Sequence, residues 1–332
     1  MYNIIKEDVN NIISRINFDY LNNKSVLVTG ASGLVGLYFM SCLRELKKKY
    51  NIQVYATFKS DINNYLNDIF DFDCNKIQCD INDFKSDIKF DLIIHAAGYG
   101  QPGKFLDNKI KTIQINTTAT INLFNYLNDG GKFFFVSTSE LYSGNDNFNI
   151  SENEIGSTNT THPRACYIEG KRCGETICHS YHLNGYDVKV GRLSLAYGPG
   201  TKHDDKRVLN SFIEKAIKNN KIEMMDSGDS IRTYCYISDV IEIMWNIILT
   251  GEDFIYNIGG KSQTSILDLA KLIGDILNVE VISPPNTNGM DGNPKIVNIS
   301  IDKDLNEFEK KDLITLSDGS KNIILWQKNI HK

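Results

Sequence analysis

Apolar positions recur along the chain in two rhythms that predict two kinds of element. Continuous apolar runs predict buried strands, at residues 25–29, 53–57, 76–79, 92–96, 132–137 and 188–193. Stretches with helical spacing lie between these runs, at 34–48, 113–127 and 167–183. Buried strands that alternate with helices are typical of a doubly wound parallel sheet, so we predict an α/β domain over residues 25–195.

The alternation loosens beyond residue 195. Helices are predicted there at 208–219, 237–249, 266–277 and 316–327, with short strands between them and a Pro-, Asn- and Gly-containing loop at 284–294. We interpret residues 196–332 as a smaller α/β lobe that binds a substrate, with some exchange of chain between the two domains.

Residues 1–24 precede the first predicted strand. Their apolar residues recur at helical spacing: Ile4, Ile5, Val9, Ile12, Ile13 and Ile16. This pattern predicts a helical extension that packs on the main body. A frayed terminal tail is the alternative.

Composition narrows the class of protein. The 332 residues carry a net charge of −5, with 41% hydrophobic and 23% charged residues, which is ordinary for a globular chain. There is no basic surplus to bind nucleic acid or an anionic membrane, although a local arginine cluster could still bind an anionic substrate. The seven cysteines are odd in number and form no C-x-x-C, which indicates reduced thiols.

The chain shows no pattern of a leader or a membrane span. Lys6, Glu7 and Asp8 interrupt the apolar residues near the start, and no run approaches the roughly 20 apolar residues of a spanning helix. We therefore expect a cytoplasmic protein.

The segment VLVTGASGLVG joins the first strand to the first helix of the domain. Gly30 permits a tight turn, Gly33 lets the backbone approach a pyrophosphate, and Gly36 allows close packing of helix on strand. The spacing is G-x-x-G-x-x-G, and in this strand–loop–helix setting it predicts a Rossmann site for NAD or NADP. The neighbouring residues predicted to contact the cofactor are Ser32, Leu34 and Val35.

The end of the second strand bears on the choice of cofactor. A carboxylate that binds the ribose 2′-hydroxyl is expected about 20 residues after the glycine loop. The segment YATFKSD has Thr57 and Lys59 there instead, and Asp61 comes too late. A cation without an acid favours NADP over NAD, although Lys59 could equally be a solvated surface residue.

Further cofactor contacts are predicted at the ends of the third and fourth strands. Asp80 could accept a hydrogen bond from the adenine amino group, with Ile81 against the ring. The small residues Ala96, Ala97 and Gly98 let the fourth strand pass close to the cofactor.

Tyr167 and Lys171 are four residues apart in ACYIEGKRCGE and therefore share a helical face. A tyrosine with a pKa near about 10 is a poor base at neutral pH. An ammonium one turn away, together with a nicotinamide ring, would stabilise its phenolate. Tyr167 could then take a proton from a hydroxyl while hydride leaves the same carbon.

The segment VSTSELYS lies at the end of the most apolar strand and supplies further polar groups. Thr138 is predicted to bind the reacting oxygen and Glu140 to act as a second acid or base. Ser137 and Asn116 are predicted to lie on the cofactor side. No metal site is predicted, because the pair His179 and His182 has no evident third ligand.

These motifs resemble the extended short-chain dehydrogenases of the NAD-dependent epimerase/dehydratase family, over about residues 24–328. STSELY and PRACYIEGKRCGET are most similar to the UDP-glucuronate decarboxylases, which have Thr-Ser-Glu at this strand end. Related 4,6-dehydratases usually have Thr-Asp-Glu, so Ser139 argues against dehydration. The resemblance implies oxidation at C4 of a nucleotide-diphosphate hexose for surface-polysaccharide precursors, and a homodimer formed through helices 113–127 and 167–183.

The resemblance extends to the substrate side with some departures. It implies that Arg207 and Arg232 bind the diphosphate and that Thr138 and Ser139 contact the sugar. Leu195 stands where the family has a substrate-contacting Asn, and Gly200 where decarboxylases often have Arg. The loop GYGQPGKF also differs from the decarboxylase Ser-Pro pattern.

Three functions therefore stay open. The first is a decarboxylase, epimerase or dehydratase that recycles its bound cofactor. The second is a one-way reductase of 4-keto nucleotide sugars that consumes NADPH. The third is a non-catalytic, cofactor-binding protein.

Overall fold

The computed structural model describes residues 2–202, 204–284 and 298–330. Its centre is a seven-stranded sheet of order β10-β6-β5-β4-β1-β2-β3, and every neighbouring pair runs parallel. The strands are β1 (Ser25–Thr29), β2 (Gln53–Phe58), β3 (Asn75–Gln78), β4 (Phe90–His95), β5 (Leu127–Thr138), β6 (Asp187–Leu193) and β10 (Ile255–Ile258). The predicted doubly wound Rossmann fold is confirmed.

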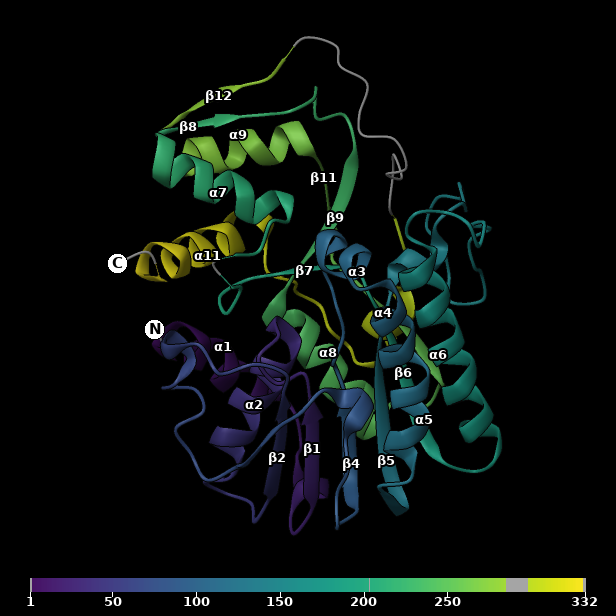
Figure 1. The fold of residues 1–332 in the computed structure, drawn as a ribbon. Coiled ribbons are helices and arrows are strands. Elements are labelled where there is room, and N and C mark those ends of the chain that lie inside the picture. Colours follow the sequence, from purple (N-terminus) through teal and green to yellow (C-terminus); the bar gives the residue numbers. More distant parts are fainter. Residues whose placement is uncertain (1, 203, 285–297, 331–332) are drawn as a thin grey trace.

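Helices cover both faces of this sheet (Figure 1). One face packs against α1 (Tyr2–Arg15), α2 (Leu34–Leu46) and α8 (Ile237–Thr250) in the larger core. The other packs against α4 (Lys109–Asn116), α5 (Thr118–Phe124) and α6 (Ala165–Leu183). The strand order reverses between β1 and β4, and ligands of such folds bind at the carboxyl ends of the strands at this point.

The amphipathic pattern near the N-terminus forms helix α1. Its apolar residues Ile5, Val9 and Ile12 are buried against α2 and α8, which excludes a frayed tail. The short 3-10 helix η1 (Asp19–Leu21) then leads into β1.

A smaller layer lies beyond the carboxyl ends of the large sheet (Figure 1). A three-stranded sheet of order β11-β9-β7 and a two-stranded sheet β12-β8 build it. The strands are β7 (Leu195–Tyr197), β8 (Lys221–Glu223), β9 (Ile231–Tyr236), β11 (Ser262–Ser265) and β12 (Glu280–Ile282). Its main helices are α7 (Val208–Asn219), α9 (Ile266–Leu277) and α11 (Leu316–Ile330), and the short α10 (Asp302–Glu307) contacts β10.

The boundary expected near residue 195 is crossed by the chain. β10 pairs with β6 in the large sheet, and α8 packs on the same layer, although both follow β7. The division into a Rossmann domain and a substrate lobe stays a prediction. The loop expected at 284–294 lies, apart from residue 284, outside the described residues.

The single helix expected over 113–127 is wrong. The chain forms α4 and α5 with a break at Thr117, whose backbone angles are φ −118° and ψ −78°, and Leu127 already belongs to β5. The hydroxyl of Thr117 donates to the carbonyl of Ile113 at 2.9 Å. Such side-chain bonds from Ser and Thr to the preceding turn compete with the helical ladder and bend helices.

In the described part of the chain, every helix is too short or too polar to cross a membrane.

Candidate active site

The glycine loop between β1 and α2 packs closely against the backbone that follows β4. Gly30 has φ +66°, and a Cβ atom there would lie 2.6 Å from Cα of Ala97 on the neighbouring strand end. Gly33 is exposed, and no side chain caps the helix that begins after it. The first N–H groups of α2 therefore lack a side-chain cap, and they belong to a turn with exposed Gly33 and partly exposed Leu34 and Val35, next to Ser32. This cradle fits a dinucleotide pyrophosphate.

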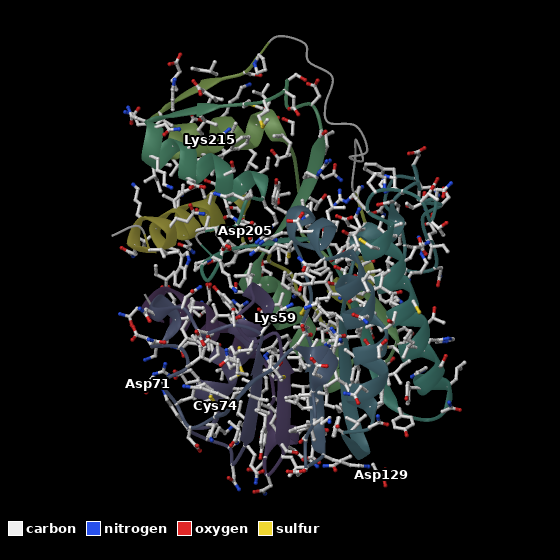
Figure 2. The ribbon with its side chains drawn as sticks, in the orientation of Figure 1. Lys59, Asp71, Cys74, Asp129, Asp205 and Lys215 are labelled. Atoms are coloured by element: carbon white, nitrogen blue, oxygen red, sulfur yellow. The ribbon has the colours of Figure 1, made fainter. Side chains whose placement is uncertain are left out.

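The residues at the ends of β2 and β3 contact each other. Lys59 lies 3.4 Å from the carboxylate of Asp80 and also bonds the hydroxyl of Tyr99, so it is not merely solvated. Burial acts to raise the pKa of Asp80, but the backbone N–H of Asn82 and the charge of Lys59 hold it below its usual value. Figure 2 labels Lys59 near the strand ends.

Thr57 has a role inside the loop. Its hydroxyl accepts a hydrogen bond from the backbone N–H of Gly30 at 3.3 Å. The side chain at the end of β2 therefore supports the turn of the glycine loop.

Tyr167 stands near the start of α6 and is 9% exposed. Its ring stacks on Phe105 of the short helix α3 (Pro102–Asp107), with centroids 4.7 Å apart and planes at 4°. Burial, and secondarily the charge of Glu140, raises the pKa of Tyr167 to about 12, while a hydrogen bond with Thr138 opposes the rise. The hydroxyls of Tyr167 and Thr138 therefore lie in contact, and the predicted role of Thr138 towards a substrate oxygen stays a prediction.

Lys171 lies one turn further along α6 and is buried. Its ammonium donates to the carbonyl of Val136 at 2.6 Å and lies 4.6 Å from the ring centroid of Phe135. Burial lowers its pKa to about 8, although the charge of Glu175 opposes the fall. The backbone of Gly98 passes beside this ammonium, because a Cβ there would lie 3.9 Å from it.

Glu140 lies in the 3-10 turn η4 (Ser139–Tyr142) that follows β5, and the hydroxyl of Thr138 caps this turn. Its carboxylate forms an ion pair with Arg164, which directly precedes α6. Burial raises the pKa of Glu140, while the charges of Arg164 and Arg232 oppose the rise. Its Oε2 is buried and has no hydrogen-bond partner among the described residues.

The two arginines expected to bind a diphosphate act on this cluster electrostatically. The charge of Arg207 acts on Tyr167, and that of Arg232 acts on Glu140. Arg207 is held by both oxygens of buried Asp205, which is labelled in Figure 2. Two guanidiniums therefore lie close enough to the cluster for their charges to act on it.

The remaining predicted residues lie around this cluster with less informative contacts. Asn116 donates to the carbonyl of Thr112, and its Oδ1 is buried without a partner in the described chain. Ser137 donates to Glu175. Leu195 is partly buried in β7 opposite Tyr234. Ile81 and Ser139 are buried, and Ala96 and Ala97 follow the end of β4.

The backbone explains the glycine at position 200. Gly200 has φ +94°, and a Cβ there would lie 2.6 Å from the side chain of Leu37 in α2. Any other residue would be strained there and would clash with α2.

Two side chains of the site were missed by sequence reasoning. Arg164 and Phe105 form a layered contact, with the guanidinium carbon 5.6 Å from the centroid of the ring that stacks on Tyr167. Arg164 stands three residues before Tyr167 in PRACY, and this position was the available signal. Phe105 had none, because it ends the segment GYGQPGKF, which was expected to be a loop; the structure forms α3 there, beginning at Pro102.

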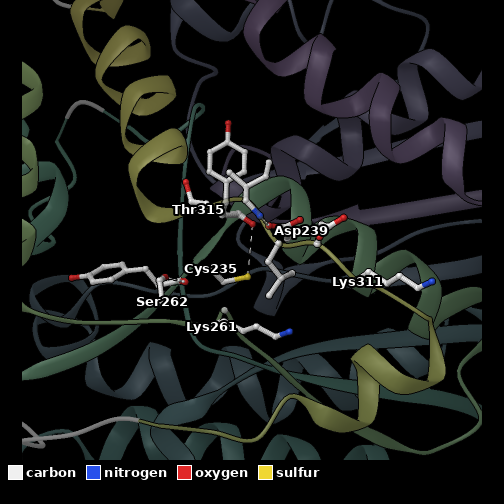
Figure 3. Close-up of a pocket in the computed structure, with 12 residues that line it drawn as sticks. Cys235, Asp239, Lys261, Ser262, Lys311 and Thr315 are labelled. Carbon is white, nitrogen blue, oxygen red and sulfur yellow. Dashed lines mark hydrogen bonds between the residues drawn. The ribbon is translucent and has the colours of Figure 1, made fainter.

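The structure contains a cavity of about 290 Å³ outside the cluster, between the start of α8 and residues 311–315. Figure 3 shows Asp239, Lys261 and Lys311 at its walls. Asp239 accepts from the backbone N–H of Ile314 at 2.7 Å. No predicted site residue lines this cavity. The described residues contain no group of three or more His, Cys, Asp or Glu placed to hold a metal ion.

Comparisons with known proteins fit this geometry. Residues 26–259 match the model of the NAD dependent epimerase/dehydratase family. UDP-glucuronic acid decarboxylase 6 of Arabidopsis thaliana is 27% identical over 264 residues, which cover 79% of this chain and 77% of that protein. UDP-glucuronic acid decarboxylase 1 of Xenopus tropicalis is 29% identical over 77% of this chain and 61% of its own.

Solved structures share the fold. A UDP-glucuronic acid 4-epimerase from Bacillus cereus, in complex with UDP-glucuronic acid and NAD, has a TM-score of 0.76 at 22% identity, covering 92% of this chain and 99% of that one. The dTDP-glucose 4,6-dehydratase DesIV from Streptomyces venezuelae, with NAD bound, has a TM-score of 0.80 at 20% identity, covering 92% and 97%.

Proposed function

Because the chain belongs to the NAD dependent epimerase/dehydratase family, we propose that it oxidises C4 of a nucleotide-diphosphate hexose and then decarboxylates it, with a UDP-glucuronate-type substrate. The observation that carries the proposal is a cluster of four side chains. Thr138 and Glu140 stand at and just after the carboxyl end of β5, and Tyr167 and Lys171 stand in the first turns of α6. The similarity of the chain to UDP-glucuronic acid decarboxylases supports the finer reaction.

The glycine loop and the uncapped start of α2 would hold the cofactor pyrophosphate, and the backbone at Ala97 and Gly98 would border its nicotinamide end. When bound, NAD(P) supplies the hydride acceptor for C4 and can return the hydride. The residues present fit such a group, because among the described residues beyond its chain neighbours, the one atom that a Cβ at Gly98 would approach within 4 Å is the ammonium nitrogen of Lys171.

Tyr167 takes the proton of the C4 hydroxyl, and Thr138 holds the same oxygen. A phenol with a pKa of about 12 is protonated at neutral pH and cannot accept a proton, so the reaction needs the positive charge of Lys171 to stabilise the phenolate. Without substrate, burial disfavours both the phenolate and the ammonium; as neighbours of opposite charge they would stabilise each other.

In the second step the substrate is a β-keto acid, because the ketone at C4 is beta to the carboxyl group on C5. The bond from C5 to the carboxyl carbon breaks, carbon dioxide leaves, and the electron pair remains on C5 as an enolate with the C4 oxygen. C5 must then receive a proton. Glu140 has a raised pKa and one oxygen without a partner, so we assign it to deliver this proton.

Mass spectrometry of sugar nucleotides tests the proposal. Incubation with UDP-glucuronate and no added reductant is expected to yield a UDP-sugar lighter by one carbon dioxide. Tyr167→Phe is expected to lower the rate by about 100- to 10,000-fold. Tyr186→Phe, at a 40% exposed tyrosine on the same side of the sheet, is the control and is expected to keep the rate. Full turnover by Tyr167→Phe would disprove the assignment.

A second function is favoured by one observation, the lysine at the end of β2. Lys59 follows β2 where an acid that binds a ribose 2′-hydroxyl would stand, which supports NADP and one-way reduction of a 4-keto nucleotide sugar, and the nearest carboxylate is that of Asp80 at the end of β3, 3.4 Å away. Denaturation of the purified protein and identification of the released cofactor separates the cases. A reductase consumes NADPH stoichiometrically, whereas a decarboxylase retains NAD and needs none.

We also propose a homodimer. Large apolar side chains are exposed on the outer faces of the helices that the resemblance singles out, at Ile110, Ile113 and Ile121 of α4 and α5 and at Leu183 of α6. Sedimentation equilibrium is expected to show two chains, and Ile110→Glu is expected to separate them.

A further inference from the structure

A buried ion pair lies behind Lys171 and has no part in the reaction steps above. Tyr167, Lys171 and Glu175 follow one another at intervals of four residues, so they share one face of α6. Glu175 faces Arg192 of β6, and their side chains are only 8% and 6% exposed.

The carboxylate of Glu175 is fixed by two side chains of neighbouring elements. Nε of Arg192 lies 3.1 and 3.2 Å from its two oxygens, and Nη2 lies 2.8 Å from Oε2. The hydroxyl of Ser137, at the end of β5, donates to Oε1. Both oxygens therefore have donors, which hold the carboxylate in one orientation.

Arg192 is anchored in turn. Its Nη1 donates to the hydroxyl of Tyr142 at 2.7 Å, and that hydroxyl donates to Asn257 of β10 at 2.6 Å. Asn257 donates to the backbone of Ile150 and Ser300. A continuous set of buried hydrogen bonds thus connects Glu175 to strands β6 and β10 and to the segments beyond them.

Few charged or titratable groups face Lys171. Cys178 comes from α6, His95 from β4, and the Phe135 ring and Val136 carbonyl from β5. Among the described residues whose charge acts on Lys171, Glu175 is the one carboxylate. His95 is buried with a pKa near 3, so it adds no positive charge at neutral pH.

We propose that Glu175 is a positioning residue: its carboxylate, fixed by Arg192 and Ser137, keeps Lys171, one helical turn from Tyr167, a buried cation directed at the Val136 carbonyl. The proposal rests on the proposed function only for its consequence, which is that Lys171 can stabilise the Tyr167 phenolate. The state of Lys171 itself can be measured in the protein without substrate.

The test is an NMR titration of protein labelled with ¹³C at lysine Cε, with the Lys171 signal assigned by its loss in Lys171→Met. In Glu175→Gln the midpoint of Lys171 is expected to fall by about one pH unit, a tenfold loss of proton affinity. Glu169→Gln is the matched control, because Glu169 lies on the same helix in an ion pair with Arg172 and away from Lys171. Its midpoint is expected to equal that of the wild type.

The rate provides a second readout. In Glu175→Gln, the pH at which kcat/KM falls on the basic side is expected to shift to lower pH by the same amount as the NMR midpoint of Lys171. A purely structural role would instead lower the rate equally at all pH values. Glu175→Asp, with the carboxylate one methylene further back, is expected to shift the midpoint less.

The outcomes separate cleanly. An unchanged Lys171 midpoint in folded Glu175→Gln, or in folded Glu175→Asp if the first variant does not fold, would overturn the proposal. If no nucleotide sugar is turned over, the proposed function fails, yet the NMR titration still decides the role of Glu175.

Discussion

One carboxylate–guanidinium pair acts on Tyr167 and another lies behind Lys171, and the two pairs are built differently. Glu175 and Arg192 are 8% and 6% exposed, and both carboxylate oxygens have donors. Glu140 and Arg164 are 27% and 16% exposed, and Oε2 of Glu140 has no hydrogen-bond partner in the described chain. The first pair is suited to hold a fixed charge, and the second to exchange a proton.

The secondary structure around each pair matches this difference. Glu175 lies within helix α6 and Arg192 within strand β6, where the backbone is held by regular hydrogen bonds. Glu140 lies in a single 3-10 turn, and Arg164 precedes the first turn of α6. Catalytic and binding side chains are found disproportionately on such connections between regular elements.

The largest expected difference is in stability. Arg192→Met leaves the carboxylate of Glu175 buried without its cation, which is expected to lower the free energy of unfolding by about 3–5 kcal/mol. Arg164→Met removes a partly solvated pair and is expected to cost less than about 1 kcal/mol. Urea unfolding followed by circular dichroism measures both.

The double variant Arg192→Met/Glu175→Leu is the control for this comparison. Replacing both partners by apolar side chains is expected to restore much of the loss, because no unpaired charge remains. Equal losses in Arg192→Met and Arg164→Met would show that the two pairs are not different in kind.

The next effect is on the rate. Glu140→Gln keeps the shape of the side chain but cannot transfer a proton, so turnover of UDP-glucuronate is expected to fall by about 100-fold or more while stability changes little. If the C4 oxidation alone survives, a 4-keto product accumulates and can be trapped by borohydride. Glu169→Gln, at a surface ion pair on α6, is expected to leave the rate unchanged.

The two pairs also show what sequence could and could not predict. Local patterns predict the strands, the glycine loop and the pair Tyr167 and Lys171, because each of these depends on residues that are near one another in the sequence. The partners Arg164 and Arg192 depend on contacts between residues 24 and 17 positions apart. Such contacts are set by packing.

Some signals for the missing residues were nevertheless present. Arg192 interrupts the apolar run of β6, and a charge in a buried strand requires a partner. Glu175 stands at the same four-residue spacing from Lys171 as Lys171 from Tyr167. The break between α4 and α5 had a weaker signal, the three Thr residues around it, since single Thr residues are common within helices.

A third carboxylate, without any guanidinium, sharpens the comparison. Asp8 of α1 is 7% exposed and accepts hydrogen bonds from the hydroxyls of Tyr38 at 2.8 Å and Tyr236 at 3.0 Å. Burial raises its pKa to about 6 from 3.8, although the two hydroxyls oppose the rise. Between these values the folded protein binds more protons than the unfolded chain, so the contribution of Asp8 to stability grows as the pH falls through 6.

The smallest effect is therefore a change in pH dependence. From pH 7 to pH 5, the wild type is expected to gain about 1 kcal/mol relative to Asp8→Asn, measured by urea unfolding at both values. Taking the difference between the two proteins cancels the titration of all other groups. A difference that stays constant with pH would mean that Asp8 remains ionised without a cation, and that hydroxyl donors alone can do for a buried carboxylate what Arg192 does for Glu175.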